Sequence, residues 1–141
     1  MFDKTYEDRL GAWVAFRNTL EESKDPITDV IECYNNAPTV SIHIDPWDQQ
    51  SWPDPWQLIQ ENQYCEFARV LGMCYSLQLT DRFTGSLFEI HITTSYEESA
   101  NYYILVVDNH AIGYYNSSYT TVADLPISLV AQKIYKMPPR Q

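Results

Sequence analysis

The residues that could carry out covalent chemistry in this 141-residue chain are a cysteine, a histidine and an aspartate on successive predicted elements. A nucleophilic cysteine needs its thiolate, which a helix N-terminus, a nearby cation or a histidine can stabilise. The base must lie within hydrogen-bond reach, and a carboxylate usually orients it. Cys65 opens a predicted helix, His91 lies on a later predicted strand, and Asp108 ends the strand after that. These three residues are the candidates for cysteine-dependent catalysis.

Helical projection separates Cys65 from the second cysteine of the same predicted helix. At about 100° per residue, one side of this helix carries an apolar stripe. The stripe consists of Tyr64, Phe67, Ala68, Leu71 and Cys74. Cys65 lies off its centre, on the side of Arg69. The pattern predicts that Cys74 belongs to the core, and it leaves Cys65 open as either a nucleophile or a small apolar core residue.

The segment WPDPWQLIQENQYCEFARVLGM, residues 52–73, resembles the region around the active cysteine of transglutaminase-like cysteine proteinases. That family shares an aromatic-proline lead, a short acidic helix and a cysteine that opens the next helix. VVDN at 106–109 is similar to the context of the family's aspartate. The resemblance implies Cys65 as nucleophile, His91 as base and Asp108 as orienting carboxylate. It implies acyl transfer to water or an amine through a thioester, on a transglutaminase-like or papain-like arrangement.

The elements that must position these residues begin with helices. Apolar spacing predicts a helix over 4–22, and a second helix opens at the Asp25-Pro26 pair. A capping-box pattern at Asp54 opens a third. The cysteine-led helix is predicted over about 64–72, and past the glycine at its end the apolar period changes from 3.6 to 2.

Strands follow the helices. Alternation predicts strands at 39–45, 75–79 and 88–93. A run that is apolar on both faces predicts a central strand at 102–107, which returns through 110–116 after a hairpin turn at Asp108-Asn109. The C-terminal segment fits either a short helix after the Leu125-Pro126 pair or an edge strand over 132–137. Consecutive strands with short loops predict an antiparallel meander. The predicted fold is therefore a single α+β domain over 1–137, with N-terminal helices packed on the sheet and a frayed tail at 138–141.

Three tryptophans cluster before the cysteine. Trp47, Trp52 and Trp56 lie within one ten-residue stretch, where a proline-rich loop leads into a predicted helix. They could form an aromatic platform that binds a sugar, a peptide or a partner protein. The alternative is a small satellite core beneath the proline-rich loop, which the usual burial of aromatic side chains favours.

Metal and cofactor sites have little support. His43 and Asp45 project from one face of a predicted strand, and His110 could join them. The chain has no Cys-x-x-Cys or His-x-x-x-His spacing, so a solvated strand face and no metal are expected. Four glycines and no glycine-rich phosphate loop also predict no nucleotide cofactor.

Charge and composition limit the partners. The net charge of −10, with nine scattered basic residues, argues against nucleic acid as a partner. No apolar run approaches the roughly 20 residues that span a bilayer, and the acidic N-terminus does not resemble a signal peptide. Three cysteines without paired spacing predict free thiols in a cytoplasm.

The sequence leaves two functions open. The short, acidic chain, rich in tyrosine and asparagine, also resembles in overall character small proteins of marine tailed bacteriophages, which implies host cytoplasm or virion. The first expectation is a protein that acts through contacts with a protein partner or through self-association. The alternative is a cysteine hydrolase or acyltransferase that uses Cys65, His91 and Asp108.

Overall fold

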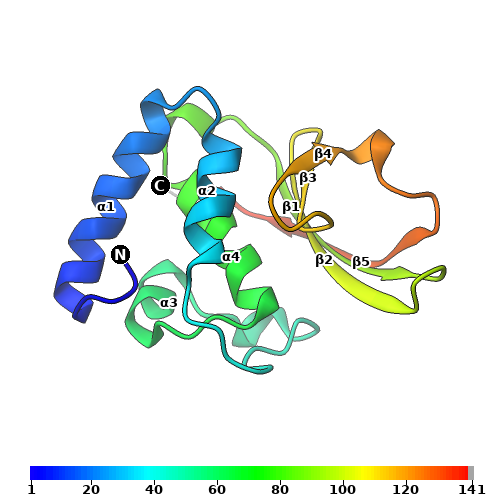
Figure 1. Ribbon diagram of the computed structural model, residues 1–141, viewed down its shortest axis with the longest axis horizontal. Helices are drawn as coiled ribbons and strands as arrows, with labels where there is room; N and C mark the ends of the chain where they lie inside the picture. Colours follow the sequence, from blue (N-terminus) through cyan, green and yellow to red (C-terminus); the bar gives the residue numbers. More distant parts are fainter. Residues whose placement is uncertain (140–141) are drawn as a thin grey trace.

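The computed structural model describes residues 1–139, in which four α-helices precede a five-stranded sheet. The helices are α1 (Tyr6–Glu22), α2 (Pro26–Asn35), α3 (Pro55–Glu61) and α4 (Glu66–Gln78). The strands are β1 (Phe88–Ser95), β2 (Ala100–Val107), β3 (His110–Ile112), β4 (Tyr119–Thr121) and β5 (Leu129–Met137). Figure 1 shows the helices gathered beside the sheet, with α4 between the other helices and the strands. The α+β class predicted from the sequence is confirmed.

Local capping explains where two helices begin. The Asp25 side chain accepts a hydrogen bond from the backbone nitrogen of Thr28 at 3.2 Å, and Pro26 occupies the first helical position of α2. Asp54 and Gln57 form a reciprocal capping box at α3, with hydrogen bonds of 2.8 and 2.9 Å. Both predicted helix starts are confirmed, because each depends only on neighbouring residues.

Helix α4 is longer than the sequence predicted. It continues through Gly72 to Gln78, so the predicted strand at 75–79 is wrong. A side chain on Gly72 would clash with the Tyr34 ring of α2, because an added Cβ would lie 2.8 Å from Cζ and 2.9 Å from Cδ1. The glycine therefore permits close helix packing and does not end the helix. Residues 75–78 are all buried, which removes the one-sided periodicity that distinguishes a helix from a strand.

The predicted strand at 39–45 is also wrong. Only Thr39 forms a bridge, to Tyr64, and the following residues run irregularly across the helical half. Ile42 is 89% exposed although the alternating pattern placed it on the buried face. No strand of the sheet pairs with this segment, so it has no ladder partner among the described strands.

The sheet is antiparallel throughout, in the order β4-β3-β2-β1-β5. The predicted Asp108-Asn109 turn is present, with Asp108 in the left-handed region at φ 55°. The C-terminal segment forms β5, which returns to pair with β1 and is not added beside β4. In the predicted tail, the Pro138 carbonyl accepts a hydrogen bond from Gln78 at 3.0 Å, and residues 140–141 lie outside the described residues.

The sheet has two differently covered faces. We call the side packed on the helices the helix face; its residues in the main core are Phe88, Ile90, Leu105, Val107, Ile112 and Met137. The opposite side, the outer face, carries a second small core of Ile104, Val106 and Ala111. The helices and the helix face of the sheet therefore share one hydrophobic core. Across residues 1–139, no helix has both the length and the apolar character needed to cross a membrane.

Candidate functional site

Cys65 lies in the main core. It is the N-cap residue of α4, and its side chain makes no capping hydrogen bond. The residue is 5% exposed and belongs to the same apolar cluster as the helix face of the sheet. The projection that placed Cys65 off the apolar stripe is therefore misleading, because residues from beyond α4 cover a helix start on more than one side.

His91 lies on the other side of the sheet. In β1 it is opposite Ile104 of β2, which belongs to the outer-face core. Directly opposed residues of antiparallel strands project from the same face, so the imidazole points away from the helices. Its Nε2 lies 2.9 Å from a carboxylate oxygen of Glu89. The sheet itself therefore separates His91 from Cys65.

Asp108 has a structural role in the turn between β2 and β3. Its carboxylate accepts a hydrogen bond from the Leu87 backbone nitrogen at 2.9 Å, and its own nitrogen donates to the Leu87 carbonyl at 2.9 Å. Leu87 precedes His91 by four residues, which corresponds to about 13 Å along a strand. The structure thus brings none of the three predicted catalytic residues together. Each has a structural role of its own.

The residues that were considered as metal ligands each have a different partner. His43 pairs with Glu61 at 2.9 Å, whereas the Asp45 carboxylate accepts a hydrogen bond from the Trp47 backbone nitrogen at 2.9 Å. His110 lies on β3 with its ring 5.4 Å from that of Tyr119. Within residues 1–139, no three His, Cys, Asp or Glu side chains are grouped so that they could hold a metal ion.

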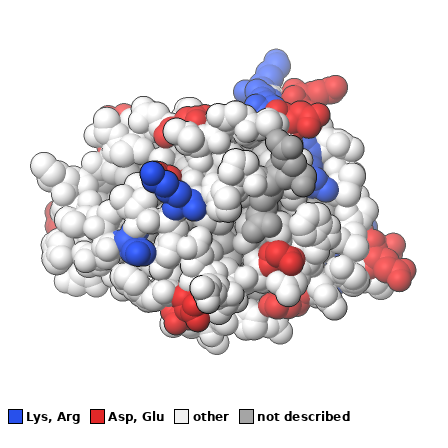
Figure 2. All heavy atoms as spheres, turned by 180° about the vertical axis from the view of Figure 1, so that it is seen from behind, with Lys and Arg blue, Asp and Glu red and all other residues white. Residues whose placement is uncertain are grey.

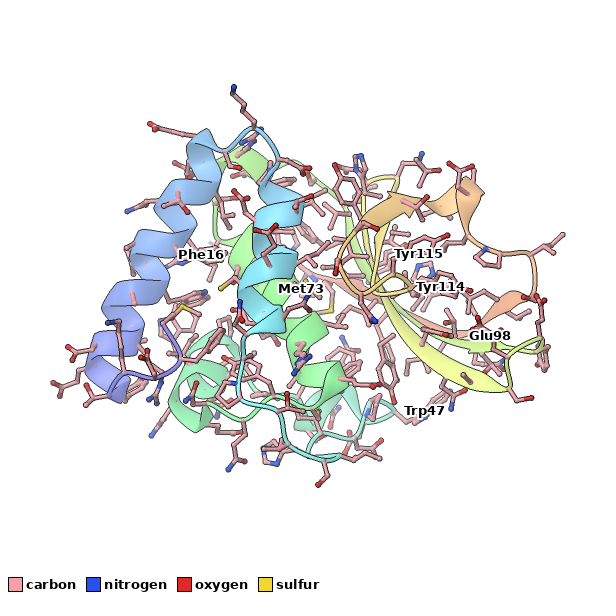
Figure 3. All side chains as sticks on the ribbon, in the orientation of Figure 1. Phe16, Trp47, Met73, Glu98, Tyr114 and Tyr115 are labelled. Atoms are coloured by element: carbon pink, nitrogen blue, oxygen red, sulfur yellow. The ribbon has the colours of Figure 1, made fainter. Side chains whose placement is uncertain are left out.

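The three tryptophans have different environments. Trp52 packs between Phe67 and Tyr135, with ring centroids 4.8 Å apart in both pairs, as a satellite core requires. Trp56 is 49% exposed and its ring packs edge-on against that of Trp13, and Trp47 is 59% exposed at the periphery (Figure 3). No ring contact joins any two of the three in the described part of the chain. They therefore do not form one continuous platform.

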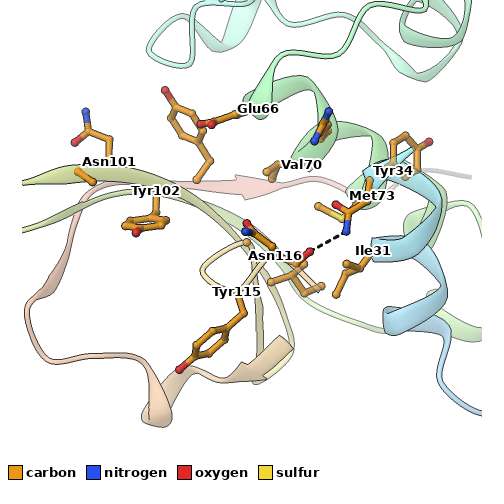
Figure 4. A pocket seen from close by; sticks show the side chains of 15 residues that line it. Ile31, Tyr34, Glu66, Val70, Met73, Asn101, Tyr102, Tyr115 and Asn116 are labelled. Atoms are coloured by element: carbon orange, nitrogen blue, oxygen red, sulfur yellow. Dashed lines mark hydrogen bonds between the residues drawn. The ribbon is translucent and has the colours of Figure 1, made fainter. Parts of the chain in front are cut away.

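A cavity of about 380 Å³ lies between α2, α4, β2 and the segment after β3. Its lining includes buried apolar side chains on the helices: Ile31, Val70 and Met73. Its rim consists of exposed or half-buried polar and aromatic side chains: Asn101, Tyr102, Tyr115 and Asn116. Figure 4 shows the apolar group on the helical side and the two tyrosines on the sheet side.

Hydrogen bonds and charges shape this cavity. Asn35 of α2 donates to the Asn116 carbonyl at 2.8 Å, which ties the helix to the segment after β3 (Figure 4). The first turns of α4 contribute Glu66 and Arg69. Arg69 donates to the Thr39 hydroxyl, while Glu66 is exposed and makes no ion pair with any described residue. The cavity therefore offers a carboxylate, amides and hydroxyls around an apolar floor.

One tyrosine of the cavity has a raised pKa. Burial and, after it, the negative charge of Glu66 raise the pKa of Tyr103. Like any tyrosine hydroxyl at neutral pH, it can donate a hydrogen bond. Sequence reasoning missed this cavity, because four segments far apart in the chain build it and none carries a motif. In the sequence, only the abundance of tyrosine and asparagine could have indicated such a cavity.

Comparison with protein-family models and with curated proteins finds no match. The resemblance to transglutaminase-like cysteine proteinases stays a prediction based on residues 52–73 and 106–109. The resemblance in character to phage proteins likewise stays a prediction.

Proposed function

We propose that this protein acts by binding a partner protein, and that the cavity between α2, α4 and β2 receives an anchor side chain from that partner. The cavity itself is the observation that supports this proposal. Its volume of about 380 Å³ falls in the range of about 300–1,000 Å³ that is usual for ligand sites. No cysteine or histidine is among the described residues that line it, so its composition favours binding over cysteine chemistry.

The lining also favours a protein as the ligand. Tyrosine, methionine and arginine are enriched at protein interfaces, and all three types occur here, as Tyr102, Tyr115, Met73 and Arg69. Anchors that dominate binding energy fill such pockets while weaker contacts exclude water around them. A buried apolar floor beneath an amide and hydroxyl rim suits an aromatic anchor with one polar end, as in tryptophan or tyrosine.

N-acetyl-tryptophanamide is a suitable probe for the anchor. At about 0.3 kcal/mol per heavy atom, a probe of roughly 18 heavy atoms gains about 5 kcal/mol, or a Kd of about 0.1–1 mM. We expect saturable shifts of the Val70, Met73 and Asn116 backbone amides in NMR spectra of labelled protein. N-acetyl-alaninamide should cause much smaller shifts, because it cannot fill the apolar floor.

A pair of tryptophan substitutions supplies the control. Asn101→Trp places a large ring at the rim of the cavity and should weaken probe binding at least tenfold. Asn18→Trp puts the same side chain on an exposed position of α1, remote from the cavity, and should leave binding unchanged. If the probe binds both variants equally, or shifts amides elsewhere, the cavity is not the anchor site.

A further inference from the structure

We propose a second docking site, independent of the cavity: the free edge of β5 takes an extended, acidic segment of a partner protein as a sixth strand. β5 is the last strand in the sheet order, and β1 is its one neighbour among the described strands. It is nine residues long. The outward-facing N–H and C=O groups of such an edge form a ready template for another strand.

The side chains of β5 make this edge unusually open. Residues 130–134 and 136 are exposed, and no proline interrupts the strand. Val130 is 40% exposed and Ile134 is 48% exposed, so aliphatic contact sites lie beside the free backbone. Natural proteins protect edges with lysines and bulges, and β5 does carry two lysines and a bulge of its own at Gln132, where its register against β1 shifts between Lys133 and Ala131. Protection alone does not explain the exposed aliphatic side chains.

The charge of β5 points to the chemistry of its partner. The whole chain carries a net charge of −10, yet β5 contains Lys133, Lys136 and no carboxylate. Figure 2, which shows the molecule from behind, has only a few, separated basic side chains and extensive uncharged surface. An acidic segment would be repelled by most of this protein and attracted at this edge.

Both lysines lack a carboxylate partner within the described residues. Lys133 lies over the Tyr135 ring, 5.4 Å from its centroid. Lys136 is opposite Glu89 in β1, but that carboxylate bonds to His91. Because side chains alternate along a strand, the two lysines project from opposite faces. A matching strand therefore carries acidic residues three positions apart, with an aliphatic residue opposite Ile134.

A synthetic nine-residue peptide can test this match. In antiparallel register it carries glutamate opposite Lys133 and Lys136, valine opposite Val130 and Ile134, and threonine elsewhere. A second peptide replaces both glutamates with lysine, and a third replaces two threonines of opposite parity with proline. Chemical shifts and hydrogen exchange of the β5 backbone amides are measured by NMR, and the mass of the free protein by sedimentation.

The expected result is slowed exchange at β5 with the glutamate peptide, and loss of this effect with the proline peptide. Two exposed ion pairs predict about a three- to tenfold preference for the glutamate peptide over the lysine peptide. The preference should shrink at high salt. The double variant Lys133→Glu and Lys136→Glu should reverse it, whereas the matched variant Lys4→Glu and Lys24→Glu in the helical half should not.

Several outcomes would overturn the proposal. Equal binding of the glutamate and lysine peptides would remove the charge complementarity, and equal binding of the proline peptide would exclude strand addition. A concentration-dependent dimer with protected β5 amides would show that a second copy occupies the edge. Failure of every peptide at β5, while N-acetyl-tryptophanamide still binds the cavity, would refute this site and leave the proposed function standing.

Discussion

Substitution of Gly72 tests how closely α2 and α4 pack. Glycine in a helix interior normally costs about 1 kcal/mol relative to alanine, so Gly→Ala inside α4 should stabilise the protein on propensity alone. At this position the added Cβ would approach the Tyr34 ring to 2.8 Å at Cζ and 2.9 Å at Cδ1, and Cε1 would be closer still. Either the ring or the backbone of α4 must move.

The Tyr34 ring has little freedom to move. Its residue is 1% exposed, its hydroxyl lies 2.9 Å from the Ser76 hydroxyl, and its ring packs edge-on against Phe2 and Tyr64. Overpacking of a filled core costs about 1–3 kcal/mol. After subtraction of the helix-propensity gain of about 1 kcal/mol, we expect Gly72→Ala to lower the free energy of unfolding by up to about 2 kcal/mol.

Gly11→Ala is the matched control. Gly11 lies inside α1 with nothing within 4 Å of the added Cβ, so this variant should be stabilised by about 1 kcal/mol. Urea denaturation measures both values, and thermal unfolding should show midpoints that move in opposite directions by about 2–4 °C per kcal/mol. If Gly72→Ala stabilises the protein as much as Gly11→Ala does, the close packing of α2 on α4 is refuted.

Three further predictions concern the core, acid stability and thiol access. Ser76→Ala removes a hydrogen-bond partner from the Trp13 indole nitrogen and the Tyr34 hydroxyl, which both lie 2.9 Å from the serine hydroxyl. Urea denaturation should show that the free energy of unfolding falls by about 2–4 kcal/mol. A decrease of less than about 0.5 kcal/mol would contradict this hydrogen-bond network. Burial opposes ionisation of Asp25, but hydrogen bonds at the start of α2 outweigh this effect and lower the pKa of the carboxyl group, so its ionised form stabilises the fold above the usual pKa. This stability is lost as the pH falls through the lowered pKa of the folded protein. In denaturation curves the stability difference between the native protein and Asp25→Asn should therefore shrink below about pH 4, and a difference that stays constant with pH would refute this explanation. Because Cys65 is buried, iodoacetamide should modify it at least about tenfold more slowly in the folded protein than in the urea-unfolded protein. Peptide mapping by mass spectrometry measures this rate for Cys65 alone. Fast labelling of Cys65 in the folded protein below pH 7 would support the nucleophile hypothesis instead.

Helix caps and the hairpin turn could be predicted from the sequence because their causes are local. Asp25 and Asp54 accept hydrogen bonds from residues three positions later, and Asp108 adopts the left-handed conformation within its own turn. The central strand at 102–107 was equally clear, since burial on both faces gives a continuous apolar run. The α+β class follows from these local elements in chain order.

Other features depended on contacts between distant segments. Gly72 resembles a helix end in the sequence, and only the Tyr34 ring of α2 explains it as an interior residue. The alternation at 39–45 describes a strand, but no strand of the described sheet pairs with it to complete a ladder. In both cases the missing information was the identity of the neighbour, which one-dimensional periodicity does not contain.

The candidate site shows the same division. The sequence by itself determined that this chain folds as acidic helices followed by an antiparallel sheet, and that a cysteine opens the last helix. Only the tertiary structure decided that the sheet lies between Cys65 and His91, that β5 forms a free edge, and that four segments enclose a cavity. The apolar periodicity of the sequence indicates how much of an element is buried. The packing of elements that are distant in the chain decides which residues each buried face contacts.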